Sequence, residues 1–508
     1  MSDKLNVFER ALAAMWPNVA LRRYAARQML GMVTRGYDAA QPPRGRPLPA
    51  GRSGNADLSQ ALVRMRDNAA DLMLNDPWAK KARAEIQSAY VGTGVMPTAA
   101  TSSAALNAVL DDYWSKHFVH TADFDDRTTV HGQQSQIVSI CVPRGDLAMV
   151  RRWDPDLEVP VQIQVLEGDH IDHTRNQRFA DGSRIVQGVE FNGKGKRVAY
   201  WLHPEHPGEN WPLASGRGWQ SVRVPASEVY HVGKAEGRSG MVRFPPWLHA
   251  VTVTLRDIGE ATEAELWRFK VQALLAVFIE QSGLKTGADQ LGVTKQVEDK
   301  IIQTLGPGMV HYLRPGEKPN MLTPQAAGGL KDIMRFFAHR TAAGVGVPYF
   351  HLTGDLSEAN FASYKIGQIG FGRMVEQDQE HWLIPQVCRT QWRWMVDALF
   401  LAGKIPRRDY GVAWTPSPLQ EADEYKAALA ALVRMRSGQS DPQTEIKRLG
   451  YDPREVLAKW AAFIQDVDKA GLVFDNDPRR TSQAGVMQAI NQLDELGKDG
   501  AGKPQGEQ

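Results

Sequence analysis

The sequence predicts a helix-rich α+β chain that is divided into several modules. Two patterns support this prediction. Apolar residues recur at helical spacing before residue 125 and after residue 246, whereas residues 125–231 alternate or run apolar over the lengths of strands. The chain has 508 residues, which is too long for one hydrophobic core. We therefore expect helical modules on either side of a β-rich middle.

The composition is that of an ordinary globular protein, with 43% hydrophobic residues, 23% charged residues and a formal net charge of +2. A protein that clamps nucleic acid tightly is usually basic, so this chain either binds none or surrounds it loosely. Cys141 and Cys388 lie far apart and form no disulfide framework or metal motif, which indicates a reducing compartment. The mixed composition of the first residues leads us to expect no secretory signal there. The longest apolar run, residues 271–279, is far shorter than the ~20 residues of a membrane-spanning helix.

Residues 1–57 are predicted to form an arm, with a short helix at 7–15 and a proline-rich extended linker at 42–49. A helical pattern begins at Leu58. The Asp76-Pro77 pair marks the start of another helix, because Asp is a favourable N-cap and Pro fits the first helical position. The Gly92-x-Gly94 pair follows that helix rather than a strand, so it is a weak candidate for a dinucleotide loop.

The β-rich middle is predicted from three runs at strand length, residues 138–142, 161–165 and 198–202. A further strand at 188–191 precedes Asn192-Gly193, the sequence of a tight hairpin turn.

The same region holds two histidine pairs, His170-x-x-His173 and His203-x-x-His206, with acidic residues beside both. Such side chains can hold a divalent metal, so a metal-dependent hydrolase is the alternative function. Histidine pairs on loops are common by chance, and prolines make the second pair a turn. We therefore expect surface histidines and no metal. The chain shows no general acid/base pair, catalytic triad or phosphate-binding loop, so we expect no enzyme and no cofactor.

A long helix is predicted from about residue 246 to 283, and its mixed surface is typical of a helix packed against neighbours. An insertion follows at 284–323, for which we expect a short helix at 293–304 and a strand at 309–313.

The next helix presents two different sides. Its apolar residues Leu330, Ile333, Met334 and Phe337 share one side, and a basic strip lies opposite, formed by Lys331, Arg335 and His339. The helix ends at the A-G-V-G-V-P stretch, because two glycines and Pro348 terminate helices. A polar loop at 353–360 leads to another helix from Phe361, in which Pro385 predicts a kink or a break. Three helices are expected after residue 416, two of them opened by Asp-Pro pairs.

Several short motifs, taken in order, resemble the lambda-type family of tailed-bacteriophage portal proteins. They are D-L-x-x-N-x-P before the helix at 77, V-G-x-G after it, A-G-x-G-V-P, L-T-G-D, and finally Asn360-Phe361-Ala362-Ser363-Tyr364-Lys365. The family more often has N-Y-S-S-x-R at the last motif, and its usual D-P-x-K-E is replaced here at 420–424. The resemblance covers roughly residues 60–475, and the order of the motifs is more specific than any one of them.

The resemblance implies a portal-type subunit with wing, stem, clip and crown modules. Their expected bounds are an arm and linker at 1–57, the wing at 58–245, a first stem helix at 246–283, the clip at 284–323, a second stem helix at 324–347, a tunnel loop at 348–363, a long wing helix at 364–415, a helical crown at 416–475 and a polar, disordered tail at 476–508. In such proteins a homo-oligomeric ring, commonly of twelve copies, surrounds the passage for double-stranded DNA during packaging and ejection.

The expected location is the portal vertex of the capsid in the virion, after assembly in the host cytoplasm and without contact with a membrane. The expected partners are the large terminase subunit, head-completion or connector proteins, and the major capsid or scaffold protein. The resemblance also implies residues that line the DNA channel from the stem and tunnel loop: Lys331, Arg335, His339, Asp355, Ser357, Glu358 and Asn360.

Overall fold

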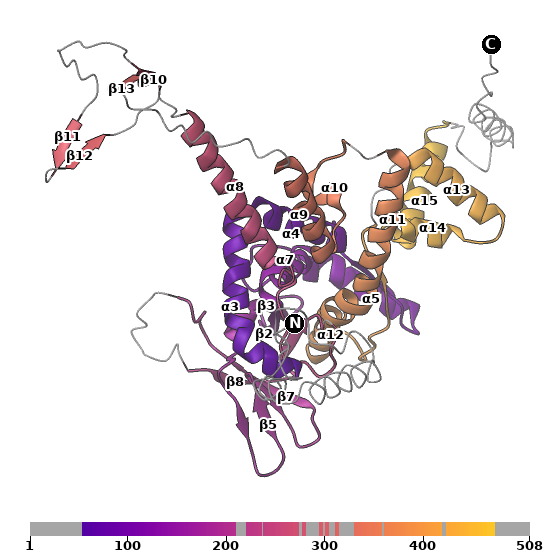
Figure 1. Cartoon of the computed structure of the whole chain (residues 1–508). Coiled ribbons are helices and arrows are strands. Elements are labelled where there is room, and N and C mark those ends of the chain that lie inside the picture. The colour runs from indigo at the N-terminus through magenta and orange to yellow at the C-terminus, as the bar shows by residue number, and fades with distance from the viewer. Residues whose placement is uncertain are drawn as a thin grey trace, which may run out of the picture. The chain divides into compact units, whose positions relative to one another are not determined.

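Two consecutive helices open the described part of the chain in the computed structural model, α3 (Gly54–Asn75) and α4 (Pro77–Val91) (Figure 1). The Asp76 side chain accepts a hydrogen bond from the Ala79 backbone N–H at 2.7 Å, and Pro77 occupies the first helical position. The Asp76-Pro77 helix start is thus confirmed. Gly92 ends α4 with a φ of +54°.

The structure describes residues 53–209, 220–235, 237–273, 277–280, 294–297, 300–303, 310–313, 330–357, 360–418 and 423–472. The chain forms two units, residues 1–57 and 58–508. The helix predicted at 7–15, the linker at 42–49 and the polar tail at 476–508 lie outside the described residues.

The core of the second unit surrounds α7 (Val130–Arg144), which corrects one prediction. Residues 138–142 were expected to form a strand, but they lie inside this helix. Its buried residues follow helical spacing: Val130, Gln133, Gln134, Ile137, Val138, Cys141 and Val142. A short apolar run suits a strand and a buried helix equally well, and the caps at Thr129 and Gly145 show which one forms. The helices α5 (Ala104–Tyr113) and α6 (Val119–Thr121), joined by the π-helix η3 (Trp114–Phe118), precede it.

Two antiparallel sheets form the β-rich middle. In the first, β2 (Asp146–Trp153) lies between β3 (Val161–Glu167) and β9 (Val229–Gly233). The second is a five-stranded meander of β4 (Gln177–Arg178), β5 (Arg184–Val186), β6 (Val189–Phe191), β7 (Arg197–Leu202) and β8 (Val222–Pro225). The strands predicted at 161, 188 and 198 are confirmed. The Asn192 side chain closes the predicted hairpin by accepting from the backbone N–H groups of Lys194 and Lys196.

A buried ionic cluster ties β2 and β9 to α3. The fully buried Asp146 accepts hydrogen bonds from Arg66, from Arg243 Nε at 2.8 Å and from the Phe244 backbone N–H at 3.1 Å. His231 Nε2 lies 3.2 Å from the same carboxylate. Burial by itself would raise the pKa of Asp146, but Arg243, Arg66 and His231 hold it well below the ordinary value. Burial lowers the pKa of His231 to about 4, although Asp146 opposes the shift, so this histidine is neutral at pH 7.

The long helix predicted from about 246 is shorter than expected. It is α8 (Thr252–Ala273), and β10 (Val277–Glu280) replaces its predicted end. The short helix expected at 293–304 is also wrong, because β11 (Thr294–Val297) and β12 (Lys300–Gln303) pair there as an antiparallel hairpin. The β-branched residues at 294, 297, 301 and 302 favour a strand over a helix. The strand predicted at 309–313 is confirmed as β13 (Val310–Leu313), which pairs with β10 in parallel.

The helix α9 (Leu330–Val345) lies beside α8 (Figure 1). Thr262 Oγ1 on α8 points to Met334 Sδ on α9 at 3.9 Å. The two glycines of the A-G-V-G-V-P stretch act differently. A Cβ atom at Gly344 would lie 2.3 Å from Val251 Cγ1, so this glycine lets α9 pack closely against Val251, the residue before α8. Gly346 has a φ of +80° and follows the end of the helix.

A short helix that the sequence did not predict, α10 (Tyr349–Thr353), precedes the polar loop. After the loop come α11 (Phe361–Asp378), the π-helix η5 (Gln379–Cys388) and α12 (Arg389–Leu401). Pro385 lies inside η5, so the backbone accommodates this proline by widening into a π-helix rather than by ending the helix.

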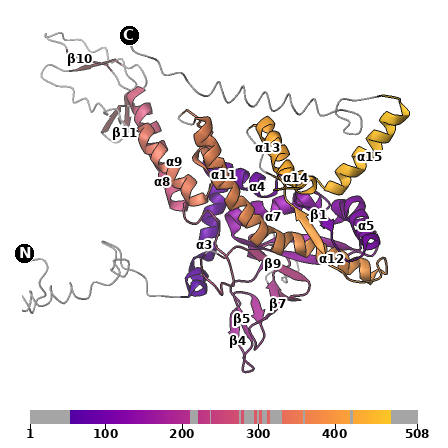
Figure 2. The same ribbon diagram turned by 90° about the vertical axis from the view of Figure 1, so that its right-hand side faces the viewer.

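The predicted boundary near residue 414 contains a strand, β14 (Val412–Thr415). It pairs antiparallel with β1 (Met96–Ala99), more than 300 residues earlier in the chain (Figure 2). Three helices follow, α13 (Glu424–Arg436), α14 (Pro442–Arg448) and α15 (Pro453–Lys469). The side chains of Asp441 and Asp452 cap α14 and α15 as the Asp-Pro pairs predict.

Candidate functional site

The basic strip of α9 does not lie directly opposite the buried side of the helix. The residues that α9 buries are Ala338, Thr341 and Ala342, whereas Ile333 is 50% exposed and Phe336 is 64% exposed. The predicted apolar side is therefore only partly buried within one chain. Lys331 and His339 are exposed, and Arg335 is half-buried beside the buried strip.

A ring stack joins the basic strip to α10. The His339 imidazole lies against the Tyr349 ring with 4.0 Å between the ring centroids and 17° between the planes. The Tyr349 hydroxyl donates to Asp355 Oδ2 at 3.2 Å, which links the stack to the polar loop. Tyr349 is a site residue that the sequence did not predict. Its position directly after Pro348, where a helix can restart, was the available signal.

The loop is ordered by its own polar side chains. Gly354, with a φ of +72°, ends α10. Asp355 Oδ1 accepts from the Ser357 backbone N–H at 3.0 Å. Hydrogen bonds from Ser357 lower the pKa of Asp355, with smaller contributions from Tyr349 and from the charge of Arg335. The carboxylate is therefore negative at neutral pH and lies within the electrostatic reach of the basic strip.

Four of the seven predicted channel residues are thus connected in the structure: Arg335, His339, Asp355 and Ser357. Lys331 lies on the same helix one turn before Arg335. Asn360 has a structural role as the N-cap of α11, where it and Ser363 form a capping box. Glu358 lies outside the described residues.

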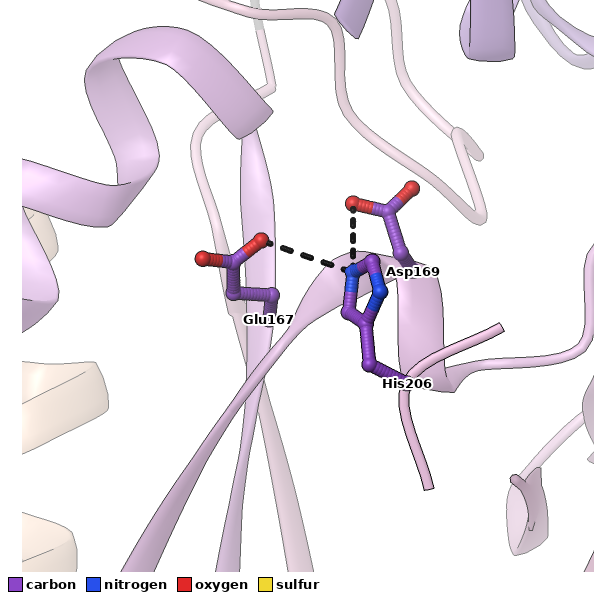
Figure 3. Close-up of side chains that lie close together, drawn as sticks. All are labelled: Glu167, Asp169 and His206. Atoms are coloured by element: carbon purple, nitrogen blue, oxygen red, sulfur yellow. Dashed lines mark ion pairs between the residues drawn. The ribbon is translucent and has the colours of Figure 1, made fainter. Parts of the chain in front are cut away.

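The histidine pairs of the β-rich middle come together only in part. His206 lies near two carboxylates at the end of β3, with its Nε2 3.8 Å from Glu167 Oε2 and 4.0 Å from Asp169 Oδ2 (Figure 3). These three side chains could contact one metal ion. His170 instead bonds through Nδ1 to the His203 carbonyl at 3.0 Å. His203 Nε2 lies 3.8 Å from Asp172, and His173 is half-buried outside the group.

Arginine side chains already occupy the carboxylates of this group. Arg144 lies 3.0 Å from Glu167 Oε2 and 3.4 Å from Asp169 Oδ2, and Arg66 bonds to Asp169 at 3.2 Å. A divalent cation at this position would lie beside a guanidinium and would have to displace it. The charges and distances therefore fit an ion-pair network better than a metal centre.

We expect chelator-free protein to contain no stoichiometric zinc or manganese by elemental analysis, because the arginines satisfy the two carboxylates. Replacing His173 and His206 together with Ala should leave assembly unchanged. Asp154→Asn, in an exposed turn away from the histidines, is the matched control. A stoichiometric metal whose removal abolished an activity would favour the hydrolase instead.

Comparisons with known proteins agree with the resemblance seen in the sequence. The family model described as phage portal protein, lambda family, matches residues 44–379, which is more than half of the chain. The matching class is therefore that of phage portal proteins. Within this class, the chain belongs to the lambda family. No helix among the described residues combines the length and apolar character needed to cross a membrane.

A probable portal protein of Halomonas phage phiHAP-1 is 26% identical over 328 residues. The matched part is 61% of this chain, and the chain spans only 61% of that relative. Among solved structures, the neck of an empty GTA particle computed with C6 symmetry aligns with a TM-score of 0.42 at 15% identity, covering 81% of this chain and 97% of the other. The neck of a native GTA particle computed with C12 symmetry gives 0.40 at 16% identity, with 81% and 97% covered.

Proposed function

We propose that this chain is the subunit of a ring at one capsid vertex and that the ring is the conduit through which double-stranded DNA is packaged and ejected. Membership of the lambda portal family carries this proposal, because the matched residues 44–379 include α9 and the loop after it. The ring has a structural role and no catalytic one. In this proposal the chain assembles in the host cytoplasm and becomes part of the virion at the portal vertex.

Negative-stain microscopy of the purified protein tests this function directly. We expect hollow rings of one fixed symmetry, with twelve subunits the most common number in the family. A protein that stays monomeric over a wide concentration range, or that forms only open filaments, would contradict the proposal.

Exposed side chains on α8 and α9 support assembly from identical copies. Trp267 on α8 is 59% exposed, and Phe336 and Ile333 project from α9. Glu260 on α8 and Arg340 on α9 are also exposed, and neither has an ion-pair partner among the described residues. Acidic and basic residues that border exposed apolar side chains suit a contact between α8 of one copy and α9 of the next.

The remaining side of α9 would then face the passage. Lys331, Arg335 and His339 lie on a different side of the helix from Phe336 and Arg340. In our proposal, the loop from Asp355 to Asn360 lies next to these three basic residues and also lines the passage. Repeated around a ring, each basic residue becomes a circle of charge. The formal net charge of only +2 agrees with a conduit, because tight phosphate clamps would stop DNA from sliding.

The module bounds expected from the sequence are part of the same proposal. The segment 284–323 would be the clip, which docks the large terminase subunit during packaging and head-completion or connector proteins afterwards. The wing at 58–245 and the crown at 416–475 would contact the major capsid or scaffold protein and surround the inner mouth of the channel.

Deleting residues 283–323 tests the clip. Because α8 and α9 already lie side by side and meet at Thr262 and Met334, a short Gly-Ser linker should close the gap. We expect rings by microscopy but loss of terminase binding in a pull-down assay and no packaged DNA. Truncation before Lys498 is the control, and the truncated protein should form rings, bind terminase and package DNA. A clip-deleted ring that still packages DNA would show that the segment is not the clip.

A further inference from the structure

The polar loop after α10 is linked to α9 through Tyr349. The Tyr349 ring stacks on His339 of α9, and the Tyr349 hydroxyl holds Asp355, the first residue of the loop after Gly354. Asp355 in turn holds the Ser357 backbone N–H. The Tyr349 side chain thus connects the helix that carries the basic strip with the first described residues of the loop.

The short helix α10 is a fixed support for this contact. Leu352 is 2% exposed and packs with Ala82 of α4 and Ala342 of α9. His351 bonds to Glu85 Oε2 on α4 at 2.9 Å and to Gln368 Oε1 on α11 at 2.7 Å. Three helices therefore hold α10, whereas Gly354 lets the chain turn away from it with a φ of +72°.

Beyond Gly354, side-chain hydrogen bonds take over from core packing. Asp355, Leu356 and Ser357 are exposed, and Leu356 is 55% exposed. The Asp355 backbone N–H bonds to Thr353 Oγ1 at 3.1 Å, and the Thr353 hydroxyl bonds to the Tyr349 carbonyl at 2.9 Å. Each of these two hydrogen bonds joins residues that are close in the sequence. The Tyr349–Asp355 hydrogen bond differs because its donor hydroxyl belongs to a ring that stacks on His339 of α9.

We propose that Tyr349 is a positioning residue that fixes the loop beside the basic strip of α9, through its stack on His339 and its hydrogen bond to Asp355. The consequence for DNA rests on the proposed function, in which this loop lines the passage. The bond also keeps the Asp355 carboxylate near Arg335, so that part of the positive charge on the strip is offset while the loop is held. Loss of the bond would free the loop and change the charge that passing phosphates meet.

Tyr349→Phe tests this role, because it removes the hydroxyl and keeps the ring that stacks on His339. Tyr364→Phe on α11 is the matched control. The Tyr364 ring packs near the Phe350 ring, with 4.8 Å between the ring centroids, and takes no part in the contact between Tyr349 and Asp355. In assembled rings, we expect hydrogen exchange at the Ser357 amide to become about two- to tenfold faster in Tyr349→Phe, as expected for one lost hydrogen bond. Tyr364→Phe should exchange like the wild type.

A double-mutant cycle separates positioning from a general loss of structure. Asp355→Ala removes the acceptor, and the double variant Tyr349→Phe with Asp355→Ala should exchange no faster than Asp355→Ala alone. Melting temperature and ring formation should stay unchanged, while the rate of DNA packaging changes in both single variants. Unchanged exchange in Tyr349→Phe, or additive effects in the double variant, would overturn the positioning role. Changed exchange with normal packaging would keep Tyr349 as the residue that orders the loop and would contradict only the placement of the loop beside DNA.

Discussion

Asp146→Asn is expected to lower the free energy of unfolding by about 3–5 kcal/mol, since it leaves buried charges without their partner. Asp146 is fully buried and holds the guanidinium groups of both Arg66 and Arg243. An amide keeps the shape of the side chain but not its charge, so Arg243 would keep no carboxylate partner within hydrogen-bond distance, only carbonyl groups. Arg66 would keep only its 3.2 Å contact with Asp169 and one carbonyl. Urea unfolding followed by circular dichroism should show a lower midpoint than that of the wild type. Expression should also give less soluble protein.

The matched control is Asp181→Asn, an exposed turn aspartate that accepts from Ser183, because an asparagine can make the same turn. We expect its free energy of unfolding to stay within about 0.5 kcal/mol of the wild-type value. An Asp146→Asn protein that unfolds at the wild-type midpoint would show that the buried cluster contributes little to stability.

Lys331→Glu combined with Arg335→Glu should spare ring assembly and reduce packaged or retained DNA by about tenfold or more, with the larger loss at low salt. The substitution exchanges two positive charges for two negative charges in every subunit, so phosphates would be repelled wherever α9 faces the passage. Individual contacts are screened over ~8 Å at physiological salt, which is why a repeated circle of charge matters more than any one residue. Packaging assays at several salt concentrations measure the effect.

Lys194→Glu with Lys196→Glu is the matched control, because it makes the same charge change on the exposed β6–β7 hairpin. This variant should package DNA normally. If the α9 variant failed to form rings, Lys331 and Arg335 would belong to a contact between subunits. If it formed rings and packaged like the wild type, they would lie away from the DNA.

Local signals in the sequence predicted much of the fold. Asp-Pro pairs at residues 76, 441 and 452 each start a helix, because a carboxylate cap and a preset proline φ act within one turn and need no distant partner. The Asn192-Gly193 turn was equally predictable. The strand predicted at 138–142 was wrong because a short apolar run takes its structure from the surrounding residues. The helix predicted at 293–304 was wrong although the β-branched residues of that segment favour the strands that form.

The candidate site divides in the same way. The spacing of Lys331, Arg335 and His339 predicted one strip on a helix, and all three residues do lie on the helix α9. The stack of His339 on Tyr349 and the bond from Tyr349 to Asp355 could not be predicted, because α10 turns the chain back towards α9. The half-buried state of Arg335 was also beyond the sequence, since Ala338, Thr341 and Ala342 decide which side of α9 is buried.

The pairing of β1 with β14 has a consequence for how the protein is made. Met96–Ala99 cannot find their partner strand until Val412–Thr415 leave the ribosome. At about 5–20 residues per second, that interval lasts roughly 15–60 s. For most of it, α7 also lacks Gln391 and α4 lacks Asp378, since those partners lie only shortly before β14 in the sequence. During it the growing chain also lacks η5 and α12, whose buried apolar residues share one core with those of α4 and α7. We therefore expect the yield of the protein to depend on chaperone capacity and translation speed as well as on the stability of the finished fold.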